Sequence, residues 1–193
     1  MENKKNVILI LGIPGSGKST LLRGVEGYKG YKSINVGTVM KKVTEEKNMD
    51  LSRDKIRYLN KDMIDQIRSE TFNRVLSSGD KLLVDTHSTI ERESKFITGL
   101  PADSEIMKDV NGIIYIDADS SEIIRRRSFD PKREREKDDE YIIDKQRDLN
   151  MAVMGFYLTY LNIPVYIINN KKGDIELSIE KFKHFIDLIE EDE

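Results

Sequence analysis

The 193-residue sequence contains no cysteine and no tryptophan, and these absences exclude several kinds of protein. Without cysteine the chain can form neither a disulfide bond nor a metal site with thiolate ligands. A protein without disulfides suits a reducing compartment, so we expect a cytoplasmic protein. Aromatic residues make up only 7% of the chain, which leaves no obvious platform for stacking nucleic-acid bases.

The sequence also lacks a strong net charge and long apolar stretches. Charged residues make up 35% of the chain, but their signs nearly cancel, at a net charge of −3. Proteins that bind nucleic acid through bulk charge are normally basic, so we expect no nucleic-acid partner. No apolar run approaches the roughly 20 residues of a membrane-spanning helix, so we expect no membrane association. The length predicts one domain, residues 1–193, with a substantial core.

The most informative stretch covers residues 7–20 and reads VILILGIPGSGKST. Its apolar beginning, residues 7–11, predicts a strand that is buried on both faces. The next residues match G-x-x-x-x-G-K-[ST] between a strand and a helix, which is the context that a phosphate-binding loop requires. We therefore expect the phosphates of a nucleoside triphosphate, which the family resemblance given below specifies as ATP, to be bound by Gly12, Ile13, Pro14, Gly15, Ser16, Gly17, Lys18, Ser19 and Thr20.

Side chains in and near this loop carry the expected chemistry. Lys18 supplies a cation for the β- and γ-phosphates, and the hydroxyl of Ser19 suits Mg²⁺. Asp85 ends the apolar run 82–85, and ligands of open parallel sheets lie beyond the carboxyl ends of the strands. Asp85 is therefore a second candidate ligand of Mg²⁺, unless it only caps the next loop. His87 follows at once, either as a substrate contact or as a solvated loop histidine.

The alternation of apolar runs and helical patterns predicts an α/β fold. A five-stranded parallel sheet with helices on both faces would form a three-layer sandwich, with strands at residues 7–11, 34–36, 82–85, 113–117 and 165–168. Thr38 is expected to cap a helix. Residues 38–78 are long for a simple crossover and predict a helical flap over a second ligand. Residues 88–103 are expected to form a loop.

Arginine-rich residues precede a long predicted helix. A capping box at residues 119–122 should begin a helix that leads to Arg126 and on to Arg133 and Arg135. Guanidinium groups on a lid, here residues 128–138, would stabilise the charge that develops during phosphoryl transfer. A solvated basic helix end and a nucleic-acid patch are the alternatives, the second weakened by interleaved acidic residues. The following helix, residues 140–161, carries methionine and aromatic residues expected to lie in the core.

Taken together, these residues resemble the archaeal-type adenylate kinases, a family of P-loop nucleoside monophosphate kinases, over nearly the whole chain. Two motifs, N-x-G-T-x-M at residues 35–40 and D-T-H-S at residues 85–88, are far more specific than the phosphate loop. The remaining similarity lies in RDKIR at residues 53–57, in GLP at residues 99–101, and in the arginines at 126, 127, 133 and 135.

The resemblance implies reversible, Mg²⁺-dependent phosphoryl transfer from ATP to AMP, which gives two ADP. Similar proteins are homotrimers, so the resemblance also implies a homotrimer. It implies catalytic roles for Lys18, Arg126, Arg133 and Arg135, and Mg²⁺ ligation by Ser19 and Asp85. It implies that AMP is bound by Asn35, Gly37, Thr38, Met40, Arg57 and His87. Another P-loop small-molecule or nucleotide kinase is the alternative, with Asp85 or His87 as base, and a non-catalytic nucleotide switch is a third.

The chain departs from the family pattern at two phosphate contacts. Residues 86–89 read THST where bacterial and eukaryotic adenylate kinases have an arginine that grips the AMP phosphate, so Arg57 and Lys41 are candidates instead. Similar chains often have Asn-Arg in the helix after the lid, whereas this chain has Leu149-Asn150. Arg147, one turn earlier, is the candidate replacement.

Overall fold

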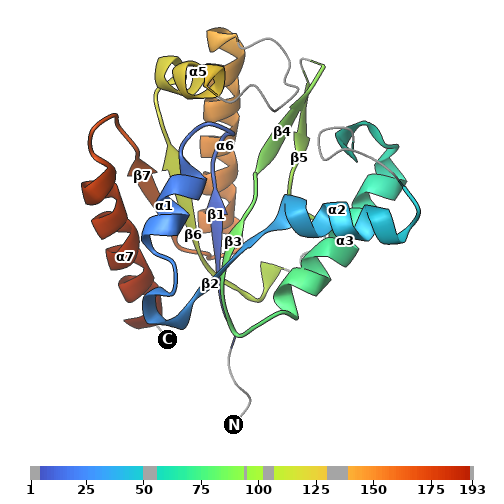
Figure 1. Cartoon of the computed structure of the whole chain (residues 1–193), viewed down its shortest axis with the longest axis horizontal. Coiled ribbons are helices and arrows are strands. Elements are labelled where there is room, and N and C mark those ends of the chain that lie inside the picture. The colour runs from blue at the N-terminus through green and yellow to red at the C-terminus, as the bar shows by residue number, and fades with distance from the viewer. Residues whose placement is uncertain (1–4, 50–55, 94, 102–106, 130–138, 192–193) are drawn as a thin grey trace.

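A parallel sheet forms the centre of the molecule in a computed structural model, which describes residues 5–49, 56–93, 95–101, 107–129 and 139–191 (Figure 1). The sheet has five strands in the order β2–β3–β1–β6–β7, which are Lys32–Asn35, Lys81–Asp85, Asn6–Leu11, Val110–Asp117 and Val165–Asn169. The helices are α1 (Lys18–Gly24), α2 (Val36–Glu46), α3 (Lys61–Leu76), α5 (Ser120–Ser128), α6 (Glu140–Tyr160) and α7 (Ile175–Glu191), with short 3-10 helices η1 (Tyr28–Gly30) and η2 (Ile56–Tyr58).

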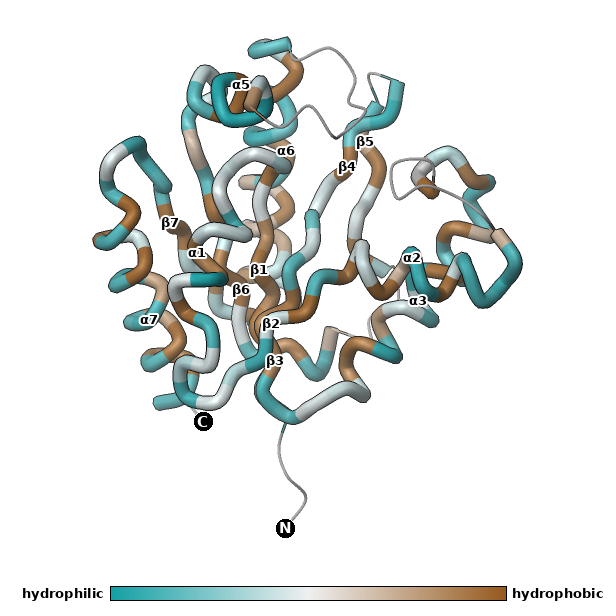
Figure 2. Tube along the Cα trace, viewed as in Figure 1, coloured by the Kyte–Doolittle hydropathy of each residue, from teal (hydrophilic) through white to brown (hydrophobic). Residues whose placement is uncertain are grey.

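The alternating side chains of β1 divide the core into two halves. Val7, Leu9 and Leu11 pack with residues of α3 and α6 on one face of the sheet. Ile8 and Ile10 pack with residues of α1 and α7 on the other. Apolar residues therefore run almost without interruption along the central strands, as Figure 2 shows, because both faces of a parallel sheet are covered by helices. The predicted three-layer α/β sandwich is confirmed.

The junction between β2 and α2 lies earlier than the sequence predicted. The strand ends at Asn35 and the helix begins at Val36, so the expectation that residue 36 is in the strand was wrong. Asn35 caps the helix, because its Oδ1 accepts a hydrogen bond of 3.0 Å from the backbone N–H of Thr38. Thr38, the predicted cap, lies within the first turn of the helix instead. The α2–α3 pair extends from this edge of the sheet (Figure 1).

Residues 88–103, predicted as a loop, contain a β-hairpin. Strands β4 (Thr89–Arg92) and β5 (Lys95–Thr98) pair antiparallel outside the main sheet. Gly99 then returns to the start of the hairpin, where its N–H donates to the carbonyl of Ser88 at 2.9 Å. A side chain at residue 99 would overlap the backbone of His87, so this close approach requires glycine.

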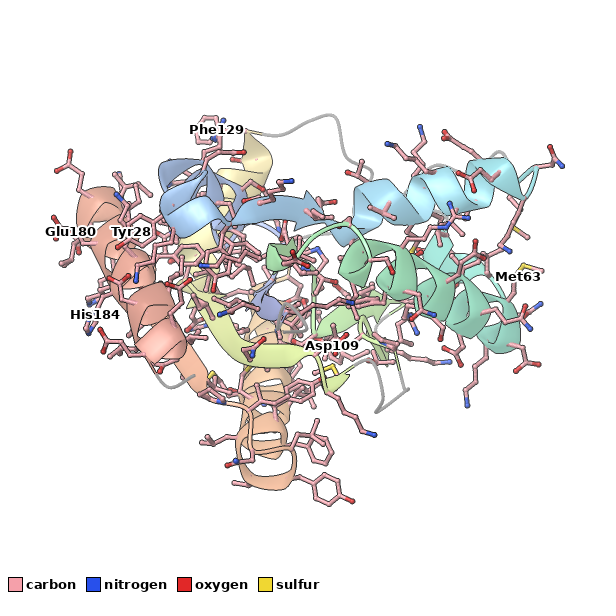
Figure 3. All side chains as sticks on the ribbon, turned by 90° about the horizontal axis from the view of Figure 1, so that it is seen from below. Tyr28, Met63, Asp109, Phe129, Glu180 and His184 are labelled. Atoms are coloured by element: carbon pink, nitrogen blue, oxygen red, sulfur yellow. The ribbon has the colours of Figure 1, made fainter. Side chains whose placement is uncertain are left out.

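Helix α6 matches the predicted span, but the prediction that its methionine and aromatic residues lie in the core was right only in part. Met154 is buried and Tyr157 packs against the core, whereas Met151, Phe156 and Tyr160 are at least 41% exposed. The helix has 21 residues, and Figure 3 shows it extending away from the sheet on the side opposite α1. Only one stripe of the helix faces the core. None of the helices in the described ranges combines the length and apolar character needed to cross a bilayer.

Candidate active site

The loop between β1 and α1 has a backbone that depends on glycine. Gly12, Gly15 and Gly17 have φ angles of 149°, 98° and 100°, in the region that side-chain-bearing residues rarely adopt. A Cβ atom at Gly12 would overlap the carbonyl of Ile116 in β6, and one at Gly17 would overlap the side chain of Asn170. The G-x-x-x-x-G spacing is thus required by the close approach of neighbouring elements.

Side chains from α5 and from the residue after β7 donate hydrogen bonds to the backbone of this loop. Arg126 donates from Nη1 to the carbonyl of Ser16 at 2.8 Å and from Nη2 to the carbonyl of Asn170 at 3.0 Å. Asn170 Nδ2 donates to the same Ser16 oxygen at 2.8 Å, and Arg127 Nε donates to the carbonyl of Pro14 at 2.8 Å. The carbonyl oxygens of Pro14 and Ser16 therefore accept hydrogen bonds from side chains outside the loop.

Arg126 belongs to helix α5 and lies before the predicted lid. Its Nε donates to Glu122 at 2.7 Å, and Arg125 donates twice to the same carboxylate. The hydrogen bonds from Arg125 lower the pKa of Glu122 most, and the hydrogen bond from Arg126 lowers it further, to about 2. The predicted capping box does not form, because Glu122 binds these arginines and Asp119 makes no side-chain cap bond. Arg133 and Arg135 lie outside the described residues.

Lys18, Asp85 and His87 meet at the carboxyl ends of β1 and β3. Lys18 is buried, and its Nζ donates to the carbonyl of Gly12 at 2.9 Å. The same nitrogen lies 3.9 Å from Asp85 Oδ1 and 3.2 Å from His87 Nδ1. His87 Nδ1 lies 2.8 Å from the Gly12 carbonyl, which only accepts, so the imidazole donates there. The sequence-based expectation that Asp85 and His87 lie near the loop is confirmed.

The oxygen atoms near Lys18 suit a hard divalent cation. Ser19, the first residue after Lys18, is exposed at the start of α1, and Asp85 offers a carboxylate that is only 7% exposed. Within the described ranges, no three His, Asp or Glu side chains cluster as a metal-binding group. Mg²⁺ typically takes one or two protein oxygens and completes its shell with water and substrate phosphates. The donors present therefore fit Mg²⁺.

The predicted AMP-binding residues divide between the β2–α2 junction and the loop after β3. Asn35 and Asp85 are partners in the register of β2 and β3, and Asn35 Nδ2 donates to Asp85 Oδ2 at 2.6 Å. Gly37, Thr38 and Met40 lie in the first turns of α2, and His87 lies beyond β3. Arg57 belongs to η2, and its side chain lies outside the described part of the chain.

A buried polar network behind His87 was missed by the sequence analysis. Ser88 and Thr89 donate their hydroxyls to Asn150 Oδ1 at 2.6 and 2.7 Å, and Asn150 Nδ2 donates to the hydroxyl of Tyr115 at 3.2 Å. Gln146 Nε2 donates to the carbonyl of Thr89 at 3.0 Å. Burial raises the pKa of Tyr115 to about 12. The spacing of two amide residues one helical turn apart, 146 and 150, was the available signal.

Arg147, the suggested phosphate contact, binds carboxylates in this structure. Its Nε and Nη2 donate to the two oxygens of Asp117 at 3.0 and 2.8 Å, and its Nη1 donates to Asp144 at 3.1 Å. Hydrogen bonds with Asp117 raise the pKa of the guanidinium. Ser120 also donates to Asp144. Arg147 thereby joins α6 to the end of β6, and Asp144 joins α6 to the start of α5.

The sequence matches one family model and many curated proteins. The model, described as an AAA domain, matches residues 11–144. An adenylate kinase of Pyrococcus abyssi is 31% identical over 189 residues, which cover 94% of this chain and 95% of that protein. An adenylate kinase of Methanoculleus marisnigri is 29% identical over 183 residues, which cover 90% of this chain and 94% of that protein.

Solved structures with the same fold include other kinases. A shikimate kinase from Bacteroides thetaiotaomicron has a TM-score of 0.59 and 16% identity, covering 94% of this chain and 98% of that one. A shikimate kinase from Acinetobacter baumannii has a TM-score of 0.58 and 16% identity, and the match covers 95% of this chain and 94% of that one. At such identities the likeness concerns the fold alone. The sequence similarity, which spans almost the full length of the relatives, is more specific, and the chain belongs to the family of archaeal adenylate kinases.

Proposed function

We propose that this protein transfers the γ-phosphoryl group of ATP reversibly to AMP, giving two ADP, with Mg²⁺. The observation that carries the proposal is the meeting of Lys18 and Asp85 beside the phosphate loop, in a chain of this family. Phosphoryl transfer requires positioning and charge neutralisation rather than covalent catalysis. The AMP phosphate is already an anion, so the acceptor needs no general base.

The donor side of the reaction is assigned to the loop and its neighbours. Residues 12–20 would bind the ATP phosphates, with Lys18 as the mobile cation. Ser19 and Asp85 would hold Mg²⁺, which neutralises phosphate charge when it is bound. Arg126, Arg133 and Arg135 would act on the transferred group, the last two from a lid at residues 128–138. Excluding water from the reaction requires closure of such segments over the substrates.

The acceptor side is assigned to the α2–α3 pair and to the end of β3. Residues 38–78 would form the flap that holds AMP within a single domain of residues 1–193. The AMP-binding residues would be Asn35, Gly37, Thr38, Met40, Arg57 and His87. His87 supports this assignment because it stands between the loop lysine and the hairpin that follows β3.

We also propose a homotrimer in the cytoplasm. The support for assembly is an apolar surface on α6, defined here by Leu149, Phe156 and Tyr160, which share one face of the helix and are at least 41% exposed. The rings of Phe156 and Tyr160 stack on this surface with centroids 5.0 Å apart. Contiguous exposed apolar surfaces usually mark interaction sites. The absence of cysteine agrees with the cytoplasm.

A purified sample assayed with MgATP and a panel of acceptors tests the reaction. We expect ADP to form with AMP far faster than with CMP, UMP, dTMP or shikimate. Lys18→Met should reduce the rate with AMP by orders of magnitude, because the γ-phosphate loses its cation. Lys181→Met, on the exposed face of α7, is the matched control and should leave the rate unchanged. A Lys18→Met enzyme within a few-fold of wild type would refute the proposal.

A further inference from the structure

The amide of Asn35 is used at both ends by other residues of the protein. Its Oδ1 accepts from the backbone N–H of Thr38 at 3.0 Å and from the Thr38 hydroxyl at 3.2 Å. Its Nδ2 donates to Asp85 Oδ2 at 2.6 Å. An amide engaged in this way is fixed in orientation, because a flip would bring its oxygen against the carboxylate. Both polar atoms of the Asn35 side chain are therefore engaged in hydrogen bonds within the protein.

These hydrogen bonds join the acceptor side of the site to the donor side. On one side Asn35 caps α2, the first helix of the proposed AMP flap. On the other side it holds one oxygen of Asp85, whose second oxygen faces Lys18 Nζ at 3.9 Å. Lys18 in turn donates to the Gly12 carbonyl of the phosphate loop. One amide is thus the link between the start of the flap helix and the carboxylate beside the phosphate loop.

We infer that Asn35 is a positioning residue, which orients Asp85 for Mg²⁺ and couples that carboxylate to the α2 helix. This inference rests on the proposed function, in which Asn35 would serve AMP binding by holding the start of α2 rather than through a contact between its side chain and AMP. A hydrogen bond to a metal-binding carboxylate fixes its rotamer, and loss of such a partner typically costs 10- to 100-fold in metal affinity or activity. Because α2 begins at the same amide, we expect a rotation of its first turn to displace the hydrogen bond to Asp85.

Two substitutions separate this role from simple helix capping. Asn35→Ser and Asn35→Asp both keep a good N-cap acceptor for the Thr38 N–H, and both remove the amide donor to Asp85. Asn60 offers the matched control, because its side chain caps α3 in the same way, accepting from the N–H of Met63 at 2.9 Å. Asn60→Ser and Asn60→Asp therefore change a cap without touching Asp85.

The experiment compares steady-state kinetics, metal binding and stability of the full-length variants. For Asn35→Ser we expect kcat to fall about tenfold or more, while KM for AMP changes by less than about threefold. Calorimetric titration of Mg²⁺ into the ADP complex should show about tenfold weaker binding, and ADP binding without metal should be unchanged. Both Asn60 variants should match wild type in Mg²⁺ affinity, and thermal melts should show all variants folded.

The outcomes distinguish this inference from the proposed function. A wild-type protein that does not phosphorylate AMP overturns the proposed function, whereas the metal titration still tests the Asn35–Asp85 link. A rise in KM for AMP with kcat and Mg²⁺ affinity unchanged would show that Asn35 contacts AMP, and would overturn the inference. Equal losses of Mg²⁺ affinity in the Asn35 and Asn60 variants would show that the effect comes from helix capping alone, and would overturn the inference as well.

Discussion

At the scale of single residues, Gly17 shows how the loop sequence is dictated by its neighbours. Its φ of 100° disfavours any side chain, and a Cβ atom there would overlap Asn170 Nδ2, which donates to Ser16. Gly27 offers a contrast, because its φ is 72° but a Cβ there would meet nothing within 4 Å. The two positions separate backbone strain from the loss of a contact.

We predict that Gly17→Ala weakens ADP binding at least tenfold, whereas Gly27→Ala leaves it unchanged. Both variants should lose stability, by about 1 kcal/mol at Gly27 from strain alone and by about 1–3 kcal/mol at Gly17, where the Asn170 contact is also displaced. Denaturant unfolding and calorimetric ADP titration measure the two quantities. Equal ADP affinity in both variants would contradict the role given to Asn170.

The sequence predicted the positions of single residues accurately where reactive side chains lie at the ends of buried strands. Lys18, Asp85 and His87 were expected to lie together, and they do, because parallel strands bring their carboxyl ends to one edge. The capping role of Asn35 was missed because Thr38 is also a good cap residue, and local preference cannot rank two candidates three residues apart. The link from Asn35 to Asp85 depends on the pairing of β2 with β3, which sequence spacing does not reveal.

At the scale of elements, α5 braces the loop through its acidic first turn. Glu122 binds Arg125 and Arg126, and Arg126 reaches the carbonyl of Ser16. The carboxylate must be ionised for both pairs. Because its pKa in the folded protein, about 2, lies below its ordinary value of 4.5, the pairs contribute stability above pH 4.5. That contribution is lost as the pH falls from 4.5 towards 2.

We predict that the melting temperature of Glu122→Gln depends less on pH between 2 and 5 than that of wild type. Wild type should melt at a higher temperature than the variant above pH 5, and this difference should shrink as the pH falls to 2, because only wild type loses an ionised carboxylate there. Melting temperatures measured from pH 2 to 7 test this. Glu180→Gln, at an outward-facing position on α7 in Figure 3, is the control and should follow wild type. A difference that does not change with pH would contradict the prediction.

Elements with long periodic patterns were predicted well, and short ones were not. Helix α6 and the buried strands lie within a few residues of their predicted bounds. The hairpin β4–β5 was missed because each strand has only four residues, with a mixed polar pattern. It forms there because Ser88, Thr89 and Gly99 find partners in α6 and in the chain before the hairpin. Such tertiary contacts override weak local preference.

At the scale of the whole molecule, the apolar surface on α6 is the feature that the fold of a single chain leaves unexplained. The helix buries one stripe that includes Ile143 and Met154, while Phe156 and Tyr160 remain 50% and 75% exposed. The sequence pattern predicted these aromatic residues as core because periodicity marks an apolar face without saying which molecule covers it. A second copy of the chain is the partner implied by the proposed trimer.

We predict that a Phe156→Asp, Tyr160→Asp double variant is monomeric, while wild type sediments at three times the mass of one chain. Two carboxylates in the proposed interface would have to be desolvated on assembly, at a cost that outweighs the contact. Sedimentation velocity measures the mass. Tyr141→Asp, at the opposite end of the same helix, is the control and should remain trimeric. A monomeric wild type, or a trimeric double variant, would contradict the assignment of this surface.

The bracing of the phosphate loop has a consequence for how the enzyme moves during a reaction cycle. Arg126, Arg127 and Asn170 donate hydrogen bonds to the carbonyl oxygens of Pro14 and Ser16 in the loop. The conformational entropy of ordering this segment is therefore lost when the chain folds, and an arriving polyphosphate need not supply it. We therefore expect the loop to keep its conformation while substrates enter and products leave, and we expect opening and closing in the segments around it.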